Sequence, residues 1–165
     1  MILPYSIQLN GKLTNFVERI LNGLLSYNAT KEVAAAYRFP KDVYPYNAEL
    51  IKTIKPKYHT IRADKHGRWK PGNKIHFVIF NRSKKQMRFA PVINCVSVQS
   101  IKIEWPPKTQ PGIREVNIYV DGRLLNIFEK KVLALNDGFD SLTEFEIYFG
   151  ENFNGKIIHW TNFKY

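Results

Sequence analysis

Three residues between positions 57 and 62 have side-chain types and a spacing that can do chemistry: Lys57, Thr60 and Arg62. A threonine hydroxyl can act as a nucleophile, and a lysine whose pKa is lowered by burial can remove its proton. Arginine can hold a phosphate through two parallel hydrogen bonds. Thr60 and Arg62 share one face of a regular strand, and Lys57 joins them only if the chain bends near Pro56. Because all three also have ordinary structural roles, the cluster alone indicates anion binding more strongly than catalysis.

The net charge of the 165-residue chain is +11, and it lies in one segment. Residues 52–88 contain twelve basic side chains and a single acidic one, Asp64, whereas the charges of the other residues cancel. Concentrated positive charge attracts polyanions such as nucleic acids. A solvated lysine-rich surface is the alternative. Since the rest of the chain is balanced, we predict an anion-binding cleft in this segment, without distinguishing RNA from DNA or from a small phosphorylated ligand.

Basic, aromatic and histidine side chains are interleaved in this segment and recur near position 160, a mixture that can contact phosphates and stack on bases. The polar turn at 81–86 is expected to form a phosphate-contacting hairpin tip. Ordinary buried positions are the alternative for the histidines and tryptophans. The predicted binding residues are His59, Arg62, Lys65, Arg68, Trp69, Lys70, Arg82, Lys84, Lys85, His159 and Trp160.

Several classes of protein are disfavoured by what the sequence lacks. A single cysteine, Cys95, leaves no internal disulfide and no cysteine-based zinc site. His59 and His66 lie close together without a carboxylate or cysteine to complete a metal set, so we predict neither a metal nor another cofactor. No apolar run approaches the roughly 18 residues of a membrane span, and the first residues do not resemble a signal peptide. We therefore expect a cytoplasmic protein without a membrane partner.

The order of predicted elements indicates an α+β fold in one domain, residues 1–165. Alternating and apolar runs predict strands, and two of them flank an Asp121-Gly122 turn typical of a hairpin. Helical spacing and capping residues predict the helices. We expect a small, mostly antiparallel β-barrel with helices packed outside. The strands are predicted at 2–9, 74–80, 87–105, 115–120, 123–128 and 156–161, and the helices at 15–26, 31–38, 129–135 and 141–149, with a weak turn at 47–53.

Four ordered motifs resemble those of ASCH domains, which belong to the PUA-like superfamily. Lys57-Tyr-His-Thr60-Ile-Arg62 looks like the K-x-x-T-I-R signature of that family, and the resemblance extends over about 50–165. It leaves residues 25–49 as an insertion. The chain is also similar to a subgroup of phage and bacterial proteins with a related ending, which would place it in a bacterial cytoplasm. The other three motifs are Trp69-Lys-Pro-Gly72-Asn-Lys-Ile, Asn136-Asp-Gly-Phe139 with Ser141-Leu-Thr-Glu144-Phe145, and Gly155-Lys-Ile-Ile-His-Trp160.

The resemblance implies a five- or six-stranded barrel with a cleft that binds nucleic acid, and it favours RNA. Some small ASCH proteins are instead amidohydrolases that remove the acetyl group of N4-acetylcytidine. Lys57 and Thr60 of this chain would match the base and the nucleophile of those proteins. Asp137 stands near the family's catalytic glutamate and is one methylene shorter. Hydrolysis of a modified nucleoside is therefore the first alternative. A phage or host adaptor, binding a protein partner through residues 25–49, is the second.

Overall fold

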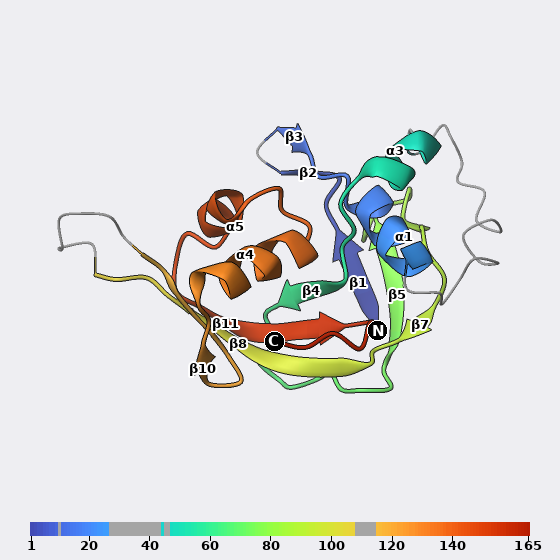
Figure 1. Cartoon of the computed structure of the whole chain (residues 1–165). Coiled ribbons are helices and arrows are strands. Elements are labelled where there is room, and N and C mark those ends of the chain that lie inside the picture. The colour runs from blue at the N-terminus through green and yellow to red at the C-terminus, as the bar shows by residue number, and fades with distance from the viewer. Residues whose placement is uncertain (10, 27–43, 45–46, 108–114) are drawn as a thin grey trace.

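The computed structural model describes residues 1–9, 11–26, 44, 47–107 and 115–165. It confirms an α+β fold whose strand pairs are mostly antiparallel (Figure 1). None of the helices in these residues has the combination of length and apolar character that crossing a membrane requires. The predicted helix at 31–38, and with it most of the 25–49 insertion, lies outside the described residues. The described helices are α1 (Phe16–Ser26), α3 (Ala48–Thr53), α4 (Ile127–Asn136) and α5 (Leu142–Tyr148).

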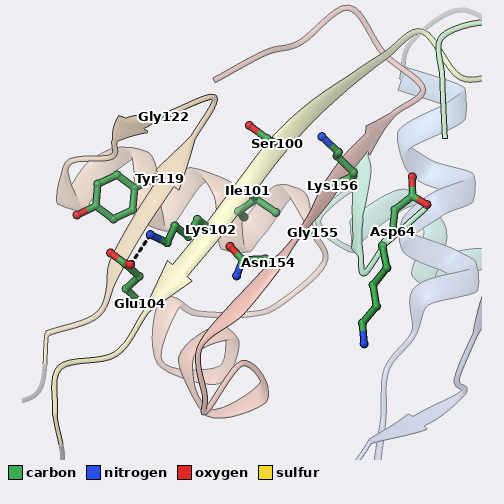
Figure 2. Close-up of a pocket in the computed structure, with 11 residues that line it drawn as sticks. Asp64, Ser100, Ile101, Lys102, Glu104, Tyr119, Gly122, Asn154, Gly155 and Lys156 are labelled. Atoms are coloured by element: carbon green, nitrogen blue, oxygen red, sulfur yellow. Dashed lines mark ion pairs between the residues drawn. The ribbon is translucent and has the colours of Figure 1, made fainter. Parts of the chain in front are cut away.

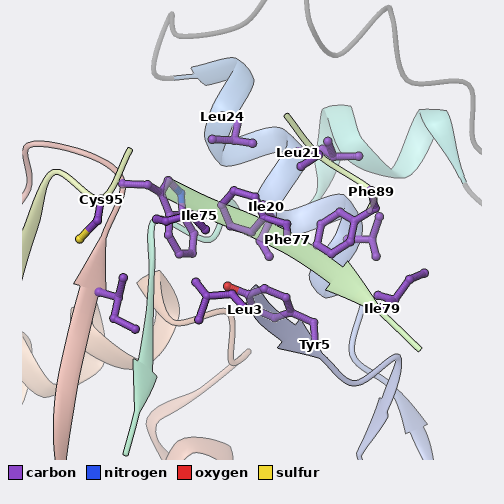
Figure 3. Close-up of a cluster of buried hydrophobic side chains, with 14 of the residues drawn as sticks. Leu3, Tyr5, Ile20, Leu21, Leu24, Ile75, Phe77, Ile79, Phe89 and Cys95 are labelled. Carbon is purple, nitrogen blue, oxygen red and sulfur yellow. The ribbon is translucent and has the colours of Figure 1, made fainter. Parts of the chain in front are cut away.

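The first sheet is built around β5 (Lys74–Ile79), the apolar strand that the sequence predicts most clearly. Strand β1 (Ile2–Tyr5) pairs with it in parallel and forms one edge of the sheet, where Pro4 costs no ladder hydrogen bond. Strands β6 (Met87–Arg88) and β7 (Ile93–Asn94) pair with it in antiparallel fashion. Figure 3 shows how α1 lays its apolar stripe on these strands. The packed side chains include Leu3, Tyr5, Ile20, Leu21, Leu24, Ile75, Phe77 and Phe89.

The second sheet has five antiparallel strands in the order β10-β9-β8-β11-β4. One of its faces carries an apolar core that α4 and α5 cover (Figure 1). The β9–β10 hairpin turns at Asp121 and Gly122, both at positive φ as the sequence predicts. The five strands are β4 (His59–Arg62), β8 (Ser97–Glu104), β9 (Asn117–Val120), β10 (Arg123–Leu124) and β11 (Phe153–His159).

The opposite face of this sheet is only partly covered. Side chains alternate along each strand, so Ile158 and Val98 face the first core and pack with it. Farther along the same face, Lys156 is paired with Arg62 on one side and with Ser100 on the other. These positions are half exposed rather than buried. The sheet therefore offers an open surface beside the segment that carries the signature.

Three predicted strands are divided or cut short in the structure, and the one expected at 87–105 is present as the separate strands β6, β7 and β8. The strand expected at 123–128 ends at Leu124, because Asn126 caps α4 and Glu129 completes a capping box with it. The strand expected at 2–9 is interrupted after β1. Its last two residues, β2 (Gln8–Leu9), pair with β3 (Lys12–Leu13) in a separate hairpin. The weak turn expected at 47–53 is confirmed as α3, which Asn47 caps.

Candidate functional site

Lys57 is buried where three separate elements meet. Its backbone N–H donates to the carbonyl of Arg19 on α1, and the next N–H, of Tyr58, donates to the carbonyl of Asn136 at the end of α4, both at 2.9 Å. Gly23 makes this approach possible, since a Cβ atom there would lie 2.3 Å from the carbonyl oxygen of Lys57. The side chain of Lys57 is only 2 % exposed. A lysine so far from solvent requires a specific partner.

Asp137 is that partner. The Lys57 Nζ donates to Asp137 Oδ1 at 2.6 Å and also to the Asp137 backbone carbonyl. The same carboxylate oxygen accepts the N–H of Ile61 at 3.2 Å. Burial lowers the pKa of Lys57 to about 8, even though Asp137 opposes the shift. Burial also disfavours the charged form of Asp137, but Lys57 and His59 outweigh it and hold the pKa of that carboxyl below its usual range. The two residues therefore form a buried ion pair.

His59 extends the pair toward the surface. Its Nε2 lies 2.7 Å from the hydroxyl of Tyr165, which also accepts a hydrogen bond from the Asn136 amide at 3.0 Å. Its Nδ1 is 3.6 Å from Asp137 Oδ1, beyond hydrogen-bond range. Burial lowers the pKa of His59, so the imidazole is neutral at pH 7. The Tyr165 hydroxyl then donates to Nε2, and the proton on Nδ1 faces the carboxylate.

Thr60 and Arg62 lie on the other face of β4, as the alternation predicts. Thr60 is 2 % exposed. The Arg62 guanidinium lies over the ring of Tyr5, 5.1 Å from its centroid, and donates to the Pro4 carbonyl at 2.7 Å. Burial raises the pKa of Tyr5, while the nearby charge of Arg62 partly offsets that rise. The structure thus joins Lys57 directly to Asp137, and Arg62 to the ring of Tyr5, while Thr60 is buried on the same face of β4 as Arg62.

The open part of the second sheet contains a shallow hollow of about 680 Å³, here called the sheet hollow (Figure 2). Lys65 enters it from the segment after β4, and Lys102 and Lys156 enter from neighbouring strands. Lys102 pairs with Glu104 at 2.5 Å. Asp64 already accepts the backbone N–H groups of Arg68 and Trp69. The other lining residues are Ser100, Ile101, Tyr119, Gly122, Asn154 and Gly155.

A second hollow, of about 580 Å³, lies beside Arg62 and is lined by Tyr5, Phe80 and Asn81 among others. Phe80 and Arg82, at the base of the predicted hairpin tip, both have positive φ, which is uncommon for residues other than glycine. Arg82, Lys84 and Lys85 are exposed there, and Lys65, Arg68 and Lys70 are exposed beyond β4. All six are free to meet an anion in solution.

Four of the predicted binding residues are buried instead. Trp69 and Trp160 belong to the first core, where Trp160 packs edge-on against Phe77 with ring centroids 5.2 Å apart. His59 and His159 are both 0 % exposed, with ring centroids 5.3 Å apart. Their prediction as contacts to a base is corrected here, because a base cannot stack on a ring that the core already covers.

Sequence reasoning did not find Lys102, Lys156 and Tyr119 of the sheet hollow, or Tyr165 of the buried network. The first three lie in strands that the sequence predicts, but only the strand register shows that they share a face with Arg62. Nothing in the local sequence indicates that Tyr165 contacts His59. Among the described residues, no three side chains of the metal-binding types gather where they could hold an ion.

Comparison of the chain with models of protein families, with curated proteins and with solved structures found no match. The resemblance to ASCH domains therefore stays a prediction.

Proposed function

We propose that the protein binds single-stranded nucleic acid across the open part of its second sheet. The observation that carries the proposal is the sheet hollow, about 680 Å³ in volume and lined by three lysines. Its open shape suits a strand rather than an enclosed nucleoside. The ASCH resemblance favours RNA over DNA and implies that the two sheets form a PUA-like barrel.

The arrangement of charge supports this proposal. Arg62 and Lys156 are register partners on adjacent strands, so their side chains emerge on one face about 5 Å apart at the backbone. Lys102 follows on β8, two residues from the partner of Lys156. Of the acidic lining residues, Asp64 accepts backbone amides and Glu104 pairs with Lys102. Arg62, Lys65 and Lys156 have no acidic partner among the described residues and supply the uncompensated charge. A row of cations across the strands can therefore follow a phosphate backbone.

Tyr119 supplies the remaining feature of a single-strand site. It lies beside Lys102 in the register of β8 and β9 and lines the sheet hollow (Figure 2). Aromatic rings next to a basic groove stack on successive bases in proteins that bind single strands. The stacking ring would thus be Tyr119 and not the buried tryptophans.

Binding of a fluorescent oligouridine, followed by anisotropy between 50 and 200 mM salt, tests this function. The wild type is expected to bind with a strong salt dependence. The double variant Lys65→Gln/Lys156→Gln is expected to weaken binding and to reduce the slope of log K against log[salt] by about 0.7 for each lost phosphate contact. Lys131→Gln, an exposed change on α4, is the matched control. Absence of binding at low salt, or equal losses in the two variants, would remove the proposal.

Hydrolysis of an N-acylated nucleoside is a second candidate, favoured by the 2.6 Å contact between Lys57 and Asp137. In this reaction Lys57 is the base, Thr60 the nucleophile and Asp137, which is ionised beside Lys57, the acid/base or orienting carboxylate. The reaction requires Thr60, on the other face of β4, to turn toward Lys57. Release of cytidine from N4-acetylcytidine, measured by chromatography, tests it. The wild type is expected to be active and Thr60→Ala inactive, whereas Thr143→Ala, an exposed change on α5, is expected to keep activity. If wild type and Thr60→Ala are equally inactive on a panel of N-acylated nucleosides, the candidate fails.

A further inference from the structure

A third hollow, of about 210 Å³, lies between the β2–β3 hairpin and α5 and shares no lining residue with the sheet hollow. We call it the hairpin crevice. Phe16 and Arg19 of α1 line it together with Gly138, which follows Asp137. Three large apolar side chains on its walls are unusually exposed: Leu13 at 63 %, Ile147 at 67 % and Tyr148 at 47 %. Contiguous exposed apolar surface beside a hollow is typical of a binding site.

The wall of the hairpin crevice is also the wall of the Lys57 site. The Lys57 Nζ lies 5.0 Å from the centroid of the Phe16 ring. A Cβ atom on Gly138 would lie 3.1 Å from Lys57 Cδ and 3.2 Å from the Phe16 ring. Phe16 is only half buried. Phe16 and Gly138 thus lie between Lys57 and the crevice.

Arg19 brings a polar requirement to the same place. Its side chain is 5 % exposed and pairs through Nη2 with Asp140 at 2.5 Å. The other two guanidinium nitrogens, Nε and Nη1, have no hydrogen-bond partner within the part of the chain that the structure describes. Both atoms are covered, so an acceptor oxygen reaches them only when the wall of the crevice opens, and it then recovers the cost of two unpaired donors on a buried cation. A ligand of the crevice is therefore expected to carry such an oxygen.

We propose that the hairpin crevice binds a planar, largely apolar molecule bearing a carbonyl or carboxylate oxygen for Arg19, and that Phe16 is the gate between this molecule and Lys57. The aromatic and aliphatic walls hold the ring, and Arg19 orients the oxygen. The chemistry that follows binding rests on the hydrolase candidate, in which Lys57 must meet a substrate. Binding and gating do not depend on it.

Labelling with trinitrobenzenesulfonate tests the gate, because this reagent is itself a planar ring with an anionic group. An unprotonated lysine nitrogen bonds to the ring carbon while sulfite leaves and a proton is released. The rate at Lys57 is followed by peptide mass spectrometry at pH 8, close to the pKa of about 8. We expect labelling of Lys57 in the folded wild type and an increase of about tenfold or more in Phe16→Ala. Exposed Lys131 provides the internal reference.

Global opening is separated from gating by a matched variant. Ile103→Ala truncates the second core, away from the crevice, and is expected to lower the melting temperature without speeding the labelling of Lys57. Equal acceleration in Ile103→Ala and Phe16→Ala would overturn the gate, and so would absence of labelling in both wild type and Phe16→Ala.

Protection by benzoate tests the binding site with a planar carboxylate. Benzoate at millimolar concentration is expected to slow labelling of Lys57 and to leave that of Lys131 unchanged. Ile147→Glu places a like charge on an exposed position of the wall and is expected to weaken the protection at least threefold without affecting the fold. Labelling of Lys57 that benzoate does not slow would overturn the site. If benzoate protects Lys57 but no acylated nucleoside is hydrolysed, the binding site is supported and only the hydrolase candidate fails.

Discussion

The ammonium of Lys57 and the carboxylate of Asp137, eighty positions apart in the chain, are 2.6 Å apart in a buried site. The pair joins the segment before β4 to the end of α4. Both residues are almost inaccessible to water, since Lys57 is 1 % exposed and Asp137 is 5 % exposed. Removal of one partner therefore strands a charge, which costs far more than the pair contributes when it is complete.

Asp137→Asn is accordingly expected to destabilise the protein by about 3–5 kcal/mol. Urea unfolding at pH 7 measures the change. Glu49→Gln, which breaks the exposed pair with Lys52 at 3.2 Å, is the control and is expected to change the free energy of unfolding by less than about 1 kcal/mol. Similar small effects in the two variants would show that Lys57 and Asp137 do not form an ion pair in solution.

Tyr165→Phe tests the hydrogen bonds that hold His59. The substitution keeps the ring but leaves His59 Nε2 and the Asn136 amide without the hydroxyl they share. We expect a loss of about 1–3 kcal/mol and a mixture of His59 tautomers, where the wild type has its proton on Nδ1. Nitrogen-15 NMR of the imidazole reports the tautomer. Tyr148→Phe, at 47 % exposure, is the control. A wild-type signal typical of the Nε2-protonated form would refute the arrangement.

Local sequence patterns predict most of this fold because they depend on neighbouring residues. The hairpin at Asp121-Gly122 requires positive φ at two adjacent positions, and the two turn residues accept it. Strand β5 and helix α1 follow their apolar spacing closely. The end of β10 was missed because the Asn126 cap competes with an apolar run that also suits a strand.

The candidate site was predictable only where its residues are close in sequence. Arg62 and Thr60 share a face as expected, since strand alternation fixes it. The partnership of Lys57 with Asp137 came from family resemblance, and that of His59 with Tyr165 had no sequence signal. Trp69 and Trp160 were assigned to a surface because composition does not say which aromatic rings the core takes. Long-range packing decides these positions.

Acid stability should depend on the two buried histidines. Burial lowers the pKa of His159 to about 3, and it also lowers the pKa of His59. A histidine pKa that is lower in the folded than in the unfolded chain means that the unfolded chain binds more protons below about pH 6.5. The stability contributed by neutral His159 is therefore complete above pH 6.5 and is lost as the pH falls toward 3.

His159→Phe is the variant that separates this effect from titrating carboxylates. Neither ring nitrogen of His159 has a hydrogen-bond partner among the described residues, so an apolar ring is expected to be tolerated at pH 7. As the pH falls from 6 to 4, the free energy of unfolding of the variant should rise relative to that of the wild type by about 1.4 kcal/mol per pH unit. Urea unfolding measures this difference. His66→Gln, an exposed change, should follow the wild type. Parallel curves for His159→Phe and the wild type would mean that His159 titrates normally in the folded protein.

Gly23→Ala is expected to destabilise the protein, against the usual trend in helices. Alanine normally stabilises a helix interior by about 0.5–1 kcal/mol relative to glycine. Here its Cβ would lie 2.3 Å from the backbone carbonyl oxygen of Lys57, and a backbone atom cannot rotate away as a side chain can. The segment before β4 must then move off α1 and strain the bond from Lys57 N–H to Arg19.

We expect Gly23→Ala to cost about 1–3 kcal/mol, the usual range for overpacking a well-filled core. Gly150→Ala is the matched control, because the nearest atom to its Cβ would be the Ile147 carbonyl oxygen at 3.4 Å, and its effect should stay within about 0.5 kcal/mol. Urea unfolding compares the two variants directly. A stabilising Gly23→Ala would mean that α1 does not approach Lys57 this closely, and the buried position of the Lys57–Asp137 pair would fall with it.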